Sequence, residues 1–238
     1  METLARVAEA PVISTSTEND LDSYLDTVAA ATALFRSAVD TYLLHGPEGE
    51  SWQQAKRMAD LMQTLDDMQQ RLETATGAQS RLGELISELI DPMSGVSRLL
   101  KDMKRQITGF AIESGFSTPG RCVPSHLIPD VQELTDEVCA AVDALVESYR
   151  PSLLWLEQAS IPDRENGVSW YEGQADRLSM QLLKKIFADE GLDIESKLPM
   201  AQLIEEIDRV ADQAESLDLE LRASCMNCLP LFAIGHSH

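Results

Sequence analysis

Hydrophobic residues recur at intervals of three and four along most of the chain, a spacing that predicts amphipathic α-helices. Runs of β-branched residues, which are typical of strands, are scarce. The pattern predicts an all-α fold with six helices, over residues 19–44, 51–76, 81–113, 127–156, 162–190 and 197–224.

Glycine and proline separate these runs. "HGPEG" at 45–49 ends the first helix, and Pro92 is expected to kink the third helix or to make its first half separate. "SGFSTPGRCVP" at 114–124 predicts a linker between two halves. The predicted organisation is a flexible arm (1–18), a three-helix bundle (19–113), the linker (114–124), a second three-helix bundle (125–224) and a C-terminal tail (225–238). "SAVDTYL" at 37–43 matches "AAVDALV" at 140–146, which supports an internal duplication.

The charge balance limits the partners. The 238 residues include 19 Lys+Arg and 40 Asp+Glu, a net charge of −21, which repels nucleic acid and favours cations or basic protein surfaces. No secretory signal is visible and no run approaches the roughly 20 apolar residues of a membrane span. The cysteines (Cys122, Cys139, Cys225 and Cys228) form no disulfide framework, so we expect reduced thiols in a cytoplasmic protein.

Acidic residues border the apolar side of the last predicted helix. Asp208, Asp212 and Glu215 fall in a band about 60° wide at 100° per residue, next to the arc of hydrophobic positions. Such a border position can face a neighbouring helix. In so acidic a chain, however, i,i+4 pairs of acids also arise by chance, so their spacing alone does not separate a solvated face from a cation site.

The preceding predicted helix places Glu172 and Asp176 on the same side as Leu183, Ile186 and Phe187. Acids on a side meant for the core need a counter-charge, a cation or a shifted pKa. Glu172 has a second interpretation, because a serine three residues earlier gives the pattern of a capping box, in which Glu172 closes the helix N-terminus. Asp176 is not explained in that way.

Two segments, "EGQADRLSMQLLKKIF" (172–187) and "IEEIDRVADQAESLDLEL" (204–221), resemble the PhoU-like proteins, in particular the branch associated with Pit-type phosphate transporters. The resemblance implies two three-helix bundles related by a pseudo-twofold axis. It also implies facing acid-x-x-x-Asp motifs that can hold multinuclear iron or zinc. The metal ligands that it implies in this chain are Glu172, Asp176, Asp208, Asp212 and Glu215.

The first half departs from this pattern. The second helix has Asp66-Asp67-Met68-Gln69-Gln70, and the third has Asp91 followed by Gly95 and Arg98 where acids are expected. Any metal site is therefore expected in the second half alone, or between that half and a partner. Carboxylate oxygens suit magnesium, manganese or iron. No Glu-x-x-His motif lies in the helices, which argues against a ferritin-like di-iron site.

Two other features have alternative interpretations. Cys225 and Cys228, with His236 and His238, could bind zinc or could simply belong to a frayed tail. "KDMKRQ" at 101–106 is the strongest basic patch, and is either a solvated face or a contact for an anion or an acidic partner. No nucleophile motif or glycine-rich phosphate loop is present.

The resemblance implies a non-enzymatic cytoplasmic regulator or accessory protein of inorganic phosphate transport. Its partner would be a protein, with a membrane phosphate transporter as the candidate and a homodimer as a further assembly. A bound metal (iron, zinc, manganese or magnesium) would stabilise or tune the second bundle. A helical interaction module without metal is the alternative, and metal-assisted hydrolysis at the carboxylates is a third hypothesis.

Overall fold

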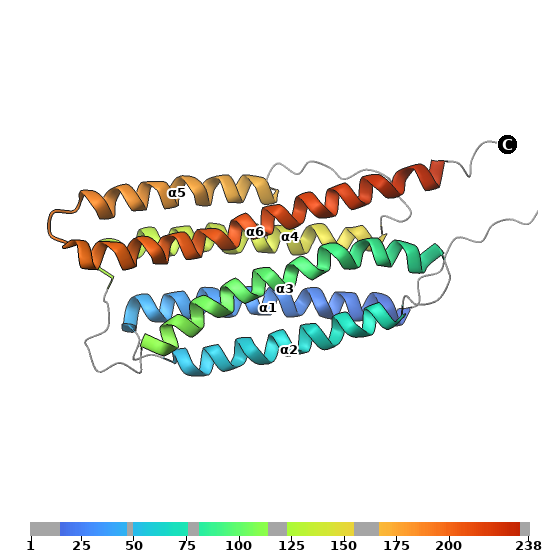
Figure 1. Cartoon of the computed structure of the whole chain (residues 1–238), viewed down its shortest axis with the longest axis horizontal. Helices are drawn as coiled ribbons and strands as arrows, with labels where there is room; N and C mark the ends of the chain where they lie inside the picture. Colours follow the sequence, from blue (N-terminus) through green and yellow to red (C-terminus); the bar gives the residue numbers. More distant parts are fainter. Residues whose placement is uncertain (1–14, 47–49, 76–80, 114–122, 155–166, 234–238) are drawn as a thin grey trace, which may run out of the picture.

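The computed structural model describes residues 15–46, 50–75, 81–113, 123–154 and 167–233. Six helices form, and the described residues contain no strand, which confirms the predicted all-α fold (Figure 1). They are α1 (Thr15–His45), α2 (Ser51–Ala75), α3 (Arg81–Glu113), α4 (Ile128–Leu154), α5 (Val168–Ala188) and α6 (Ile194–Ala233). None of these helices combines the length and apolarity needed to cross a membrane, as far as the described residues go.

The helices form two three-helix bundles, as predicted. Helices α1, α2 and α3 pack together, and α4, α5 and α6 form the second bundle beside them (Figure 1). The bundles meet through α1 against α4 and α3 against α6. Each of these contacts joins the helices that hold equivalent places in the two halves, which is consistent with the expected duplication.

Helices α1 and α4 pack together and are joined by polar contacts, an ion pair between Arg36 and Asp136 and a hydrogen bond from Gln132 to Asp40. Phe35 and Leu134 are fully buried, and burying a side chain of this size contributes about 1.5–3 kcal/mol each. Cys139 lies in this buried layer as a free thiol, with its sulfur 4.0 Å from the backbone oxygen of Thr32. Burial raises the pKa of Cys139 to about 12, so the thiol stays protonated and unreactive at neutral pH. The other three cysteines lie outside the side chains that the structure describes.

Helices α3 and α6 approach closely at Gly95. A Cβ atom at Gly95 would lie 2.0 Å from Cδ2 of Leu217 and 3.2 Å from its Cγ, and Leu217 is itself buried. Only a residue without a side chain fits beside Leu217 in this arrangement. The missing acid at this position therefore has a packing reason, namely the contact between the two bundles.

Helix α3 has its predicted limits, whereas limits of other helices differ from the sequence prediction. Helix α3 continues through Pro92, so a separate first half is wrong, and the other expectation for this proline, a kink within one helix, stays a prediction. Helix α5 begins at Val168. Helix α6 continues to Ala233, past the predicted end at 224, and its backbone includes Cys225 and Cys228. No glycine, the stop signal that ends many helices, occurs between Leu192 and Ala233. His236 and His238 lie outside the described residues.

Candidate metal centre

Helices α5 and α6 form a hairpin (Figure 1), and their facing sides are mostly apolar. The buried stripe of α5 consists of Val168, Ala175, Ser179, Leu182 and Ile186. On α6 the predicted hydrophobic arc is buried throughout, at Ile204, Ile207, Val210, Ala211, Ala214, Leu217 and Leu221. The acidic residues lie along the border where these two buried surfaces meet solvent.

Three carboxylates come together across this border. One oxygen each of Glu172 and Asp176 on α5 and of Asp212 on α6 lie within 4.8 Å of one another. Glu172 is half-buried and follows the spacing of the buried stripe, whereas Asp176 and Asp212 are exposed. The prediction that Asp176 lies on the core-facing side is therefore wrong. The buried stripe of α5 includes Ile186 but not Phe187, which is 48% exposed, and Asp176 is exposed as well.

The capping-box explanation of Glu172 is also wrong. The residue that precedes the first turn of α5 is Gly167, and no side chain caps this helix end. Ser169 lies inside the helix, so Glu172 is beyond the first turn and does not close the N-terminus. Helix capping therefore does not explain why Glu172 lies beside the other acids.

Asp208 lies deeper in the same α5–α6 contact. The hydroxyl of Ser179 is within hydrogen-bonding distance of two acceptors, Oδ2 of Asp208 at 2.8 Å and the backbone oxygen of Asp176 at 3.0 Å. The other oxygen of Asp208 is buried and accepts no hydrogen bond from the described residues. Burial raises the pKa of Asp208 to about 6, against the lowering effect of the Ser179 hydrogen bond.

Mutual repulsion makes the five predicted acids one electrostatic unit. Burial, followed by the charges of Glu215, Asp176, Asp212 and Asp208, raises the pKa of Glu172 to about 7. Burial and the charges of Asp176 and Glu215 also raise the pKa of Asp212, and Arg209 partly offsets this. The cluster therefore carries less than its full charge at neutral pH, and a cation nearby would relieve the repulsion.

The geometry suits a hard cation. Oxygens up to 4.8 Å apart can share one ion, since metal–oxygen distances run from about 2.0 Å for magnesium to about 2.6 Å for calcium. Asp208 and Glu215 add further carboxylates at the edge of the cluster, which would supply charge for a second ion. Carboxylates alone, without His or Cys in the group, favour magnesium, manganese or iron over zinc.

The first bundle offers no equivalent group among its described side chains. Gly95 packs against α6, and Arg98 is exposed. The side chain of Asp91 lies outside the described residues, as do those of Cys225 and Cys228, so the predictions for these residues stay predictions.

Two polar features of this hairpin escaped the sequence analysis. Ser179 could have been noticed as a small polar residue at a stripe position of α5. Asp218 is buried, with Oδ2 2.7 Å from Nε of Arg222, and the Asp-x-x-x-Arg spacing on one helix is a recognisable signal for such a pair. Periodicity treats both residues only as interruptions of the apolar face.

Solved structures show the same architecture. A crystal structure described as that of a PhoU-like phosphate regulatory protein from Shewanella oneidensis MR-1 superposes with a TM-score of 0.71 at 16% identity, covering 89% of this chain and 99% of the other. A second PhoU-like protein from the same organism gives a TM-score of 0.73 at 17% identity, covering 91% and 100%. The chain has the PhoU-like fold.

This agreement confirms the resemblance at the level of architecture. At such low identity, the PhoU-like fold carries no residue roles from one protein to the other. No protein-family model matches the sequence, and no curated protein matches it either. The roles of the carboxylates must therefore be argued from this chain.

Proposed function

We propose that this PhoU-like chain is a non-enzymatic cytoplasmic regulator of inorganic phosphate transport, which acts through protein contacts and binds metal on its second bundle. The carboxylate group of Glu172, Asp176 and Asp212 is the observation that carries the metal part. The description of one structural neighbour as a phosphate regulatory protein supports the transport part. The residues that would hold the cation are these three together with Asp208 and Glu215.

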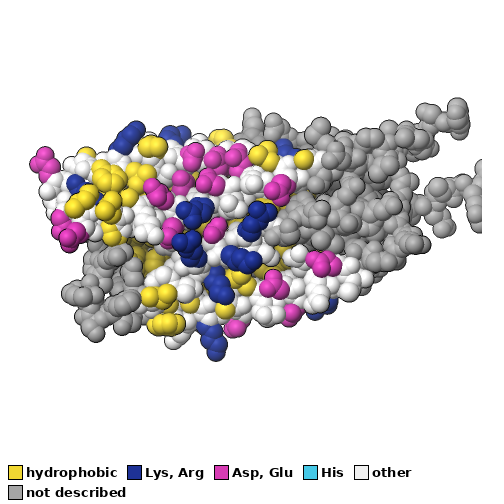
Figure 2. All heavy atoms as spheres, viewed as in Figure 1, with side chains coloured by type: hydrophobic (Ala, Val, Ile, Leu, Met, Phe, Trp, Pro, Cys, Tyr) yellow, Lys and Arg dark blue, Asp and Glu magenta, His cyan; other side chains and the backbone are white. Residues whose placement is uncertain are grey.

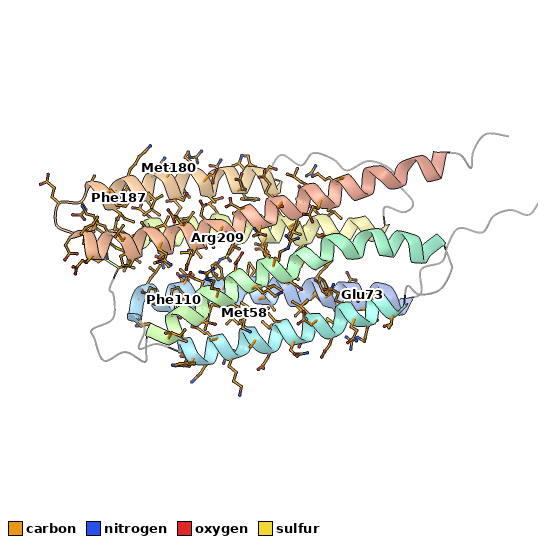
Figure 3. The ribbon with its side chains drawn as sticks, in the orientation of Figure 1. Met58, Glu73, Phe110, Met180, Phe187 and Arg209 are labelled. Carbon is orange, nitrogen blue, oxygen red and sulfur yellow. The ribbon has the colours of Figure 1, made fainter. Side chains whose placement is uncertain are left out.

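An exposed apolar patch supports the proposed protein contact. Met180 and Phe187 on α5 are 53% and 48% exposed, and Ile194 and Leu198 at the start of α6 are 58% and 56% exposed. Figure 2 shows hydrophobic side chains gathered at the hairpin end of the second bundle, and Figure 3 labels Met180 and Phe187 on α5. Clustered large apolar side chains on a surface are typical of interaction sites.

Metal analysis of protein purified without added metal tests the first part. We expect magnesium, manganese or iron, in preference to zinc, to copurify or to bind on soaking with millimolar salt. Asp176→Asn/Asp212→Asn protein should lose that metal, whereas Asp60→Asn protein, altered at an exposed acid of α2, should keep it. Absence of metal from the wild type under both conditions would favour the alternative, a helical interaction module without metal.

Copurification with the phosphate transporter of the same cell tests the second part. Phe187→Asp/Leu198→Asp protein should lose the transporter, since both side chains belong to the exposed patch. The patch could instead form a homodimer, and the molecular mass in solution tests this. If the wild type is a dimer and the same variant is a monomer, the patch serves self-association.

A further inference from the structure

A band of basic side chains crosses the contact between the two bundles. Arg98, Lys101, Lys104 and Arg105 come from α3, and Arg209 comes from α6. All but Lys104 are exposed, and Figure 2 shows Lys and Arg side chains gathered at the centre of one face. Figure 3 labels Arg209 on α6 beside α3. In a chain of net charge −21 such a concentration of cations is the exception on the surface.

The four cations of α3 are available to a ligand, whereas the charge of Arg209 also acts on Asp212. Within the described part of the chain, no carboxylate forms an ion pair with any of the five. The spacing of Arg98, Lys101 and Arg105 by three and four residues places their side chains on one face of α3. Several donors on one face can bind a single anion together without rearrangement of the helix.

Three of the cations line a cavity of about 880 Å³. Lys101, Lys104 and Arg105 form its basic wall, and Tyr42 and Phe110 form part of its apolar lining, with their rings stacked at 4.0 Å. The remaining apolar lining includes Val123, Met200 and Leu203. The cavity is lined about equally by polar and apolar side chains, and its volume lies within the range of small-molecule sites, which span about 300–1,000 Å³.

The opposite wall carries acids, but most of them already have donors. The amide of Gln202 donates to Oε1 of Glu206 at 3.0 Å, and the backbone N–H of Ser196 donates to Oδ1 of Asp193 at 2.8 Å. Glu195 is the third acid of this wall. These hydrogen bonds leave the carboxylates charged, so an anion in the cavity is expected on the α3 side, next to Lys101, Lys104 and Arg105.

We propose that this cavity binds a small phosphorylated organic anion, of the nucleoside phosphate class. Its phosphates would contact Lys101, Lys104 and Arg105, and its ring system would lie against the Phe110 side of the cavity. The overall negative charge of the chain repels a long polyanion such as nucleic acid. A small anion, by contrast, interacts mainly with the basic side chains at the one place where it is held. This proposal is independent of the metal and of the proposed transporter.

Calorimetric titration with ATP, on metal-free protein so that chelation plays no part, tests the proposal. ATP is expected to bind, tripolyphosphate to bind more weakly because it has no ring, and adenosine not to bind. Lys101→Glu/Arg105→Glu protein should lose about tenfold or more in affinity, since the substitutions remove hydrogen bonds to the charged phosphates. Arg57→Glu, a charge reversal on exposed α2, should leave the affinity within about twofold, because its charge acts only from a distance.

Three results would overturn the proposal: no heat of binding with millimolar ATP, equal losses for the two charge reversals, or equal affinity for ATP and tripolyphosphate. Circular dichroism and thermal unfolding establish that the variants fold. Should the double variant unfold, Lys101→Gln changes only one exposed side chain and must still weaken ATP binding by severalfold.

Discussion

Replacing Glu172 by glutamine isolates the repulsion within the carboxylate cluster. The amide keeps nearly the same shape but removes the negative charge of Glu172. That charge is repelled by the neighbouring acids Glu215, Asp176, Asp212 and Asp208. In metal-free protein at pH 8 the Glu172→Gln variant should be more stable than the wild type. In protein saturated with metal the sign should reverse, because the substitution then removes a ligand.

The magnitude follows from the pKa of Glu172. A rise from 4.5 to about 7 corresponds to at most about 3 kcal/mol at 1.36 kcal/mol per pH unit. Water screens charges at this half-exposed border, which reduces the expected gain to about 1–2 kcal/mol. For a chain of this size, that gain raises Tm by about 2–8 °C.

The pH dependence has a definite sign. Because the folded-state pKa is raised, the folded protein binds more protons than the unfolded chain between about pH 4 and pH 7. Protonation of Glu172 removes the repulsion, so its contribution to the free energy of unfolding is complete below pH 4.5 and is lost as the pH rises through about 7. The gain from Glu172→Gln should therefore be small at pH 5, about a quarter of its value at pH 8.

Thermal unfolding in EDTA at pH 5 and pH 8, followed by circular dichroism, measures this difference. Glu205→Gln, which removes an exposed charge of α6, is the matched control and should shift Tm little at either pH. A Glu172→Gln variant that is less stable than the wild type at pH 8 without metal would refute the reasoning, and so would a gain of equal size at pH 5.

Three further predictions concern the metal and the packing. With 1 mM manganese the wild type should gain Tm and Asp212→Asn should not, because stabilisation requires binding to the folded state. Gly95→Ala should be destabilising by about 1–3 kcal/mol, since its Cβ would overlap α6, whereas Gly109→Ala on the same helix, with no atom within 4 Å, should gain about 0.5–1 kcal/mol in denaturant titrations. Arg222→Ala should cost at least about 2 kcal/mol in the same titration, because it leaves the carboxylate of Asp218 buried without its charged partner.

Helix number and pairing could be predicted because they follow from local signals. Apolar spacing of three and four identifies each amphipathic run, and glycine and proline separate one run from the next. The third helix was predicted with the same limits that the structure shows, at 81 and 113. The end of α6 could not be predicted in the same way, since residues 225–233 carry no glycine and continue the helix past a change in composition.

The sequence could nominate the acids near the α5–α6 contact, of which the structure brings Glu172, Asp176 and Asp212 together, but it could not predict their geometry. Sequence spacing shows which acids border an apolar face of one helix. It does not show how far α5 slides along α6, and that offset decides that Asp212 meets Glu172 while Asp208 meets Ser179. The same limit applies to Gly95, which reads as a missing ligand in the sequence and is a contact point between helices in the structure.

The border position of the acids explains how the chain can carry them with and without a cation. Five carboxylates in the closed contact between the bundles would be desolvated fully, and each unpaired charge there would cost several kcal/mol. On the edge of the α5–α6 contact, water limits that cost, and the pKa values of Glu172 and Asp208 rise only to about 7 and 6. The group thus remains ionisable near neutral pH. A cation can then displace the remaining protons at a small free-energy cost, and metal affinity should increase with pH over this range.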